Sequence, residues 1–114
     1  MAIISATHDI RPTQITACKR TYVVANGHAE CDAATDRAAL MAAKAEARNQ
    51  LALAQAAALA LDCAAARGCT CTSQQRPTVQ GSGLDWSVPR KVRGRYVCKA
   101  WAYTSYYIYC KCSG

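Results

Sequence analysis

The pattern of apolar and polar residues predicts β-structure at both ends of the chain. Residues 19–24, KRTYVV, are rich in β-branched and aromatic side chains, and Asn26-Gly27 follows them. This pair is typical of a two-residue hairpin turn, in which both residues need positive φ. The pattern therefore predicts a hairpin over residues 17–31. Residues 84–112 again have strand composition, with Pro89 and Gly94 indicating an edge or a bend.

A long helix is predicted between these two segments. Fifteen of the 32 residues from Asp36 to Arg67 are Ala, which has the highest helix propensity of any residue. Asp32 or Thr35 can cap the N-terminus, and Gly68 suits the position after the C-terminus. The predicted helix covers residues 35–67, and the polar, turn-rich residues 68–83 are predicted to form a loop.

The last strand segment separates residue types by face, because successive side chains of a strand point to opposite sides. The even-numbered positions are mostly small or apolar, which suits contact with an Ala-rich helix: Cys98, Ala100, Ala102, Thr104, Tyr106, Ile108, Cys110 and Cys112. The odd-numbered positions include aromatic rings bracketed by lysines: Lys99, Trp101, Tyr103, Tyr107, Tyr109 and Lys111. One long or bent strand preserves this division. A hairpin turning at Thr104-Ser105 would mix the faces and lacks favourable turn residues.

These elements predict a single α+β domain over residues 1–114. Its long Ala-rich helix would pack on an antiparallel β-sheet, and disulfides would staple the two together. The length is ordinary for one domain. However, Phe is absent and Ala dominates the 52% of hydrophobic residues, so the core lacks large side chains. Additional stabilisation is expected.

Eight cysteines are the candidates for that stabilisation: Cys18, Cys31, Cys63, Cys69, Cys71, Cys98, Cys110 and Cys112. They permit four disulfides, whose pairing the sequence does not specify. Such a content is typical of small secreted proteins, so we expect a secreted or periplasmic location. The N-terminal residues lack the basic region and apolar run of a signal peptide. Either Met1 was added to a mature chain, or a larger precursor or unconventional export supplies the route. The alternative is a cytosolic protein with reduced or metal-bound thiols.

The same cysteines and the two histidines are the candidates for a metal or catalytic site. Cys69-x-Cys71 and Cys110-x-Cys112 could supply four thiolates to zinc, but one intervening residue is fewer than structural zinc sites commonly use. We therefore expect disulfides, with no metal and no cofactor. His8 and His28 could act as an acid–base pair, yet no nucleophile, phosphate-binding or metalloprotease motif accompanies them. We expect no catalytic residues, two inconsequential surface histidines and a protein that is not an enzyme.

The net charge of +7 is concentrated in residues 68–114, which hold seven cations and one acid. Four of the cations directly precede the aromatic strand: Arg90, Lys91, Arg93 and Arg95. Cations beside rings suit a polyanion, either nucleic acid or an acidic polysaccharide. The competing interpretation is a solvated edge that prevents sheet-to-sheet aggregation.

The favoured function is that of a non-catalytic structural or interaction protein. Tyr and Trp are enriched at protein interfaces, so the aromatic face predicts self-association or another protein partner. No run of apolar residues is long enough to span a membrane. The alternative is a secreted cationic effector, a toxin or an antimicrobial, that acts on anionic membranes or nucleic acid. An enzyme with a site built from loops is the third possibility.

Overall fold

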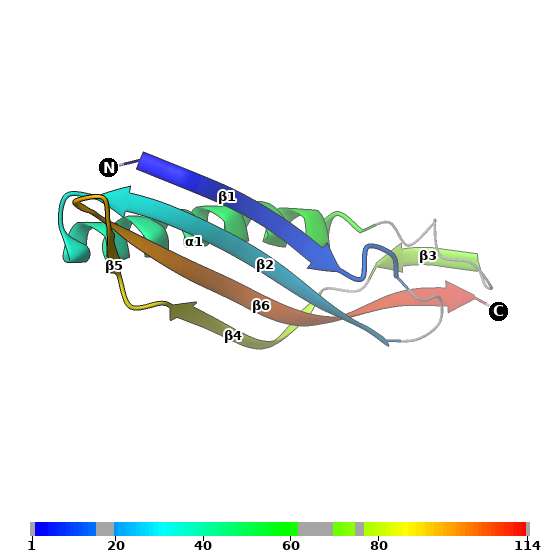
Figure 1. Cartoon of the computed structure of the whole chain (residues 1–114). Coiled ribbons are helices and arrows are strands. Elements are labelled where there is room, and N and C mark those ends of the chain that lie inside the picture. The colour runs from blue at the N-terminus through cyan, green and yellow to red at the C-terminus, as the bar shows by residue number, and fades with distance from the viewer. Residues whose placement is uncertain (1, 16–19, 62–69, 75–76, 114) are drawn as a thin grey trace.

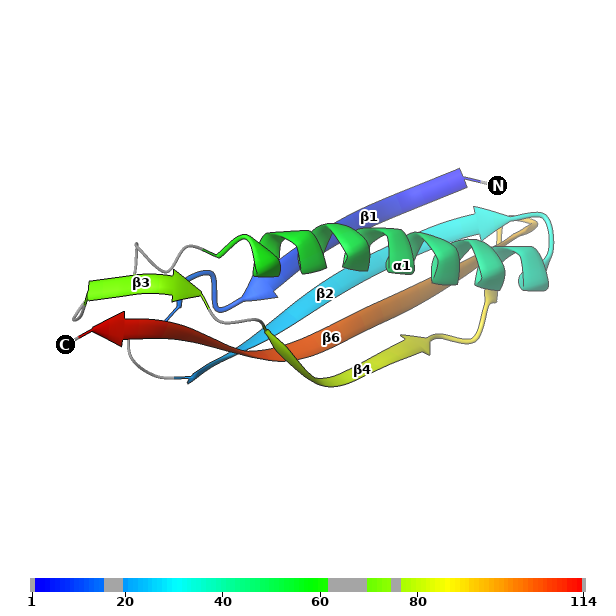
Figure 2. The ribbon, with the colours of Figure 1, turned by 180° about the vertical axis from the view of Figure 1, so that it is seen from behind.

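The computed structural model describes residues 2–15, 20–61, 70–74 and 77–113. One helix lies on one face of an antiparallel sheet, so the predicted α+β class is confirmed (Figures 1 and 2). The elements in chain order are β1 (Ala2–Arg11), β2 (Arg20–Ala33), α1 (Asp36–Leu59), β3 (Thr70–Gln74), β4 (Thr78–Trp86), β5 (Arg90–Val92) and β6 (Arg95–Ser113).

Strand β6 organises the sheet. It runs for 19 residues and pairs with β2 along one side, while β5, β4 and β3 follow one another as its other partners. Strand β1 pairs with the far side of β2, and every pairing is antiparallel. The prediction of one long strand is therefore confirmed, and the chain does not turn at Thr104-Ser105. Both residues are buried within the ladder, where Thr104 also accepts a hydrogen bond from Gln55 of α1 at 3.0 Å.

The predicted hairpin over residues 17–31 is wrong, because Asn26-Gly27 lies inside β2. Gly27 faces α1 at a point of very close approach. A Cβ atom built on Gly27 would lie 2.3 Å from both the Ala47 carbonyl oxygen and the Leu51 nitrogen. The glycine is therefore explained by helix–sheet packing, since no residue with a side chain fits there without displacing α1.

The tight two-residue turn occurs at Arg93-Gly94, between β5 and β6. Their φ angles are 51° and 80°, and Val92 pairs with Arg95 across the turn. Positive φ at both central residues is the requirement of a type I′ hairpin turn. The bend expected around Gly94 is thus a hairpin.

The helix and the loop also differ from the prediction. Helix α1 starts after Thr35, whose side-chain oxygen accepts a hydrogen bond from the Ala38 N–H, as expected for its N-cap. It has 24 residues and ends at Leu59, earlier than predicted, and Leu61 packs against the core beyond it. Gly68 lies outside the described residues.

The predicted loop 68–83 instead holds β3 and most of β4, because β6 is long enough to pair with both.

The division of β6 into two faces is confirmed. The even positions from Cys98 to Cys110 are all buried. They meet the buried alanines of α1: Ala39, Ala42, Ala43, Ala47, Ala54 and Ala58. Contact between alanines lets the first part of the helix lie near the sheet, because Ala100 and Ala102 of β6 have no long side chains. Farther along, Tyr106 and Ile108 of β6 pack in one cluster with Ala54 and Ala58. The largest fully buried side chains are only Ile108 and Val23, so the core is as poor in bulk as the composition indicated.

The described residues include only part of the predicted disulfide scaffold. The thiols of Cys31 and Cys98 are free and buried, so these two do not take part in a bridge. Cys110 is disulfide-bonded. Cys18, Cys63 and Cys69, and the side chains of Cys71 and Cys112, lie outside the description. The backbone register sets Cys71 opposite Cys112.

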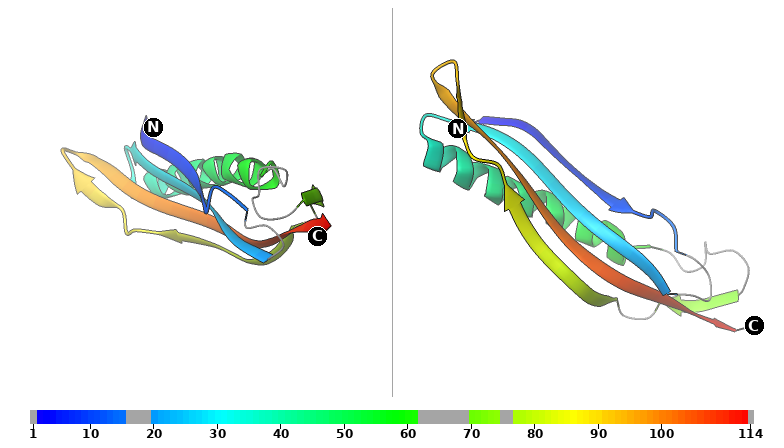
Figure 3. Two further views of the ribbon diagram at one scale, coloured as in Figure 1. Left: turned by 90° about the vertical axis from the view of Figure 1, so that its right-hand side faces the viewer. Right: turned by 60° about the horizontal axis from the view of Figure 1, so that its bottom comes forward.

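The molecule is long and thin, with extents of 62 × 20 × 14 Å. Helix α1 covers one face of the sheet, and no other described element covers the opposite face (Figure 3). We call this uncovered side the open face. No helix in the described part of the chain is long and apolar enough to cross a bilayer.

Candidate binding face on the open side of the sheet

The open face carries the odd-numbered residues of β6. Side chains of Trp101 and Tyr107 are 39% and 37% exposed, and that of Tyr22, opposite Tyr107 on β2, is 50% exposed. Tyr103 and Tyr109 are half-buried. Ser105 lies on the same side but is buried, where its hydroxyl donates to the Gly81 carbonyl of β4. The predicted row of rings therefore exists, interrupted at Ser105.

The rings pack against one another. Trp101 stacks on Tyr103 with ring centroids 5.2 Å apart, and the His28 ring lies nearly parallel to Trp101 at 6.2 Å. Tyr22 and Tyr107 form a second, tilted pair at 5.4 Å. Separations of 4.5–7 Å are favourable for aromatic pairs. The rings are thus mutually supported across β2 and β6.

A chain of hydrogen bonds fixes the central ring. Trp101 Nε1 donates to Asn26 Oδ1 at 2.9 Å, and Asn26 Nδ2 donates to Asp9 Oδ1 at 2.9 Å. Asp9 Oδ2 in turn lies 3.6 Å from Arg11 Nε. Three strands are therefore linked through polar side chains at Trp101. Asn26, which the sequence pattern assigned to a turn, instead holds the indole in place.

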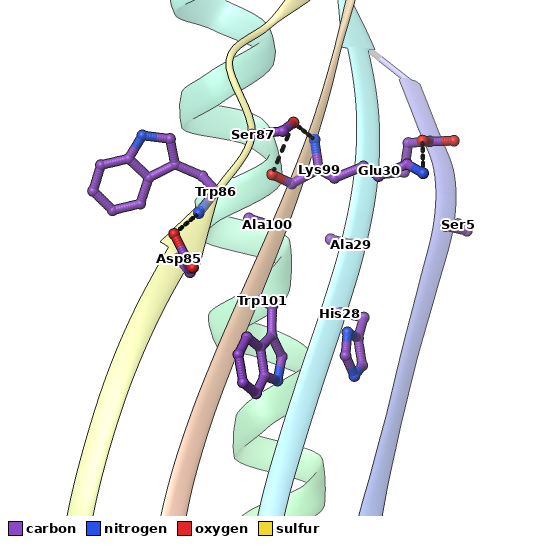
Figure 4. A pocket seen from close by; sticks show the side chains of 10 residues that line it. All are labelled: Ser5, His28, Ala29, Glu30, Asp85, Trp86, Ser87, Lys99, Ala100 and Trp101. Carbon is purple, nitrogen blue, oxygen red and sulfur yellow. Dashed lines mark hydrogen bonds and ion pairs between the residues drawn. The ribbon is translucent and has the colours of Figure 1, made fainter.

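A groove of about 640 Å³ lies beside Trp101 (Figure 4). Its lining comes from four strands and the segment after β4, and includes Ser5, His28, Glu30, Asp85, Ser87, Lys99 and Trp101. The Lys99 ammonium lies 3.6 Å from a Glu30 carboxylate oxygen. The Lys99 amide donates to Ser87 Oγ at 3.0 Å, which ties the segment after β4 to the groove.

The face is less basic than the sequence of β6 predicts. The neighbouring strand β2 brings an acid beside two of the cations: Glu30 pairs with Lys99, and Asp32 Oδ2 lies 3.2 Å from Arg95 Nε. Asp85 lies opposite Trp101 on β4. Glu30 and Asp32 are distant in sequence from the aromatic strand, and only the strand register could have identified them. The open face therefore carries both signs of charge.

The remaining predicted binding residues lie away from the groove. Arg90, Lys91 and Arg93 are exposed at the β5–β6 hairpin, at the end of the molecule where α1 begins (Figure 1). Tyr109 lies toward the opposite end, opposite Arg20. The side chain of Lys111 is outside the description. The structure thus separates the basic cluster and the aromatic row into two regions.

The histidines do not form an acid–base pair. His8 faces α1, where its Nδ1 lies 2.9 Å from Gln50 Oε1, whereas His28 lines the groove on the open face. Both histidines are exposed, as predicted. His8 joins the sheet to the helix, and His28 stacks beside Trp101. Among the described residues, no group of three or more His, Cys, Asp or Glu side chains could hold a metal ion.

No protein-family model, curated protein or solved structure matches this chain.

Proposed function

We propose that this protein is a non-catalytic structural or interaction protein that associates with a second copy of itself through the open face. The observation that carries the proposal is the uncovered face with its exposed rings, Tyr22, Trp101 and Tyr107. A contiguous aromatic patch of this kind is typical of an interaction surface. A sheet with one face buried by a helix gains further burial when a partner covers the other.

The charges on the open face favour a second copy over a polyanion. A polyanion would meet the carboxylates of Glu30 and Asp85 beside Trp101 and be repelled. A two-fold interface instead presents the same surface twice, so that cations of one copy can face acids of the other. The molecule is 62 Å long, which is sufficient for an interface of about 800 Å² per partner.

We also propose that the protein is extracytoplasmic and disulfide-stabilised. Eight cysteines in 114 residues support this, as does the disulfide of Cys110. The Ala-rich core gains little from burial of large side chains, so covalent links would contribute a large share of the stability. Intact-mass measurement with and without reductant tests the proposal, and a mass without any loss of hydrogens would contradict it.

Self-association is tested by sedimentation velocity over a range of protein concentrations. We expect the wild-type mass to rise with concentration, and the double variant Trp101→Ala/Tyr107→Ala to require at least about tenfold more protein for the same rise, because rings at interfaces often contribute 1.4 kcal/mol or more. Met41→Ala is the matched control. Met41 is an exposed apolar residue of α1, which lies on the side of the sheet opposite the open face. A monomer at every concentration would contradict the proposal.

The β5–β6 hairpin favours a second candidate function, that of a secreted cationic effector. Arg90, Lys91 and Arg93 are exposed there, and none of them is in an ion pair in the described part of the molecule. A projecting basic hairpin suits contact with phosphate or sulfate groups. The two candidates use different regions, so variants can separate them.

A further inference from the structure

Cys31 of β2 and Cys98 of β6 lie directly opposite each other in the antiparallel ladder. Both belong to the buried cluster between the sheet and α1, with exposed fractions of 0% and 1%, and both thiols are free. We propose that they form a redox site that closes to a cross-strand disulfide. This inference is independent of what the open face binds.

Backbone geometry permits the bond without a shift of either strand. Residues directly opposite in an antiparallel ladder have Cα atoms about 4.5–5.5 Å apart. Disulfides span Cα separations of about 4.4–6.8 Å. Since both side chains face α1, rotation about the two Cα–Cβ bonds brings the sulfur atoms together.

The surroundings of Cys98 provide a route for a reagent. Its Sγ lies 3.3 Å from the Ser87 carbonyl oxygen and donates to it, at the break between β4 and β5. Val88, the next residue, is 87% exposed. Local opening of this short, exposed connection would uncover Cys98 without unfolding the sheet.

The reaction is thiol–disulfide exchange with a small-molecule disulfide such as oxidised glutathione. The Cys98 thiolate attacks one sulfur of the reagent, forms a mixed disulfide and releases one small thiol. The Cys31 thiolate then attacks the Cys98 sulfur and releases the second thiol. The protein loses two protons and two electrons, which reduce one reagent disulfide to two thiols.

Closure would have two structural consequences. The bond would join residues 31 and 98, and the chain between them includes all of α1, so the helix would be confined within a covalent loop. It would also remove the Cys98 S–H that donates to Ser87. Because Ser87 lines the groove, the oxidation state of the pair would be linked to the groove wall.

Peptide mapping of the wild-type protein tests the site. Trypsin produces residues 21–37, with Cys31 as their sole cysteine, and residues 96–99, with Cys98 as theirs. After incubation of the native protein with oxidised glutathione, alkylation and digestion without reductant, we expect these two peptides joined, with a mass two hydrogens below their sum. Reductant should separate them. Recovery of both as alkylated peptides from natively folded protein, or of either joined to a different cysteine, would overturn the proposal.

The variant Cys31→Ala provides a second measurement. Oxidation should raise the denaturant midpoint of the wild type by more than that of the variant. Cys98 of the variant should be recovered as the free thiol or as its mixed disulfide with glutathione, joined to no other cysteine. An equal shift in the two proteins would overturn the proposal. Mapping of the wild type decides the matter even if the variant does not fold.

Discussion

At the scale of single residues, Gly27 determines how closely α1 can approach the sheet. The backbone of Ala47 and Leu51 occupies the space that a side chain would need. The contact lies between the two buried clusters of the core, so a displacement of α1 here would loosen packing on both sides. The main-chain atoms of a helix cannot move aside as a flexible side chain can.

We predict that Gly27→Ala destabilises the protein by about 1–3 kcal/mol, as overpacked cores do. Denaturant unfolding followed by circular dichroism measures the effect. Gly81→Ala is the matched control, because its Cβ would meet only Ser105 Oγ, at an ordinary 3.5 Å. We expect that control to lie within about 0.5 kcal/mol of wild type. Equal effects would show that space at Gly27 is not the cause.

The Cys31 thiol gives the protein a defined dependence on alkaline pH. Burial, assisted by the nearby charge of Glu46, raises the pKa of Cys31 above its ordinary 9.0. In the unfolded chain the Cys31 thiol loses its proton near the ordinary pKa of 9.0. In the folded protein the thiol is still protonated at that pH. The unfolded state is therefore favoured as pH rises, so the stabilising contribution is complete below about pH 9 and is lost on going above it. Burial also raises the pKa of Tyr106 above its ordinary 10.0. This group therefore also favours the unfolded state as pH rises.

We predict that the free energy of unfolding of the reduced wild type falls between about pH 8 and 10.5, and that it falls less steeply in Cys31→Ala. The measurement is urea unfolding at a series of pH values with reductant present. The other cysteines and the tyrosines are common to both proteins, so their contributions cancel in the comparison. Parallel curves would contradict the assignment to Cys31.

At the scale of elements, the N-terminus of α1 depends on one side chain. Thr35 adopts an extended backbone conformation and its Oγ1 accepts from the Ala38 N–H at 3.2 Å, while Asp36 adds a negative charge in the first turn. Both features satisfy or complement N–H groups that have no partner within the helix. At the other end, Gln55 and the sheet residue Thr104 are joined by a hydrogen bond.

We predict that Thr35→Ala lowers the free energy of unfolding by about 1 kcal/mol, because the cap is lost. Thr35→Ser retains the hydroxyl and should remain close to wild type. Thermal and urea unfolding measure both variants. An equal loss in Ser and Ala variants would mean that the Thr methyl group, not the hydrogen bond, is responsible.

At the scale of the whole molecule, elongation separates the two candidate surfaces. The aromatic row and groove lie along the open face. The β5–β6 hairpin, which carries the basic residues, lies at one end of the ribbon (Figure 3). We predict that the triple variant Arg90→Gln/Lys91→Gln/Arg93→Gln elutes from heparin at lower salt than wild type, since fewer cations contact the polyanion. Trp101→Ala/Tyr107→Ala should elute with wild type. A reversed order would assign polyanion binding to the open face.

Features that depend on short-range periodicity could be predicted from the sequence. Alternation along Cys98–Cys110 identified the buried and open faces of β6, Ala content identified α1, and Thr35 was correctly considered as its cap. These follow from geometry within one element, which neighbouring residues fix. Composition alone also indicates that the core contains few large side chains.

Contacts between residues that are distant in sequence could be identified only from the folded structure. The register of β2 on β6 sets Glu30 beside Lys99 and Cys31 beside Cys98, and the approach of α1 explains Gly27. The Asn26-Gly27 pair is typical of a turn. Close packing against a helix, however, also requires a residue without a side chain. Local sequence cannot distinguish the two because the deciding contact comes from about 20 residues away along the chain.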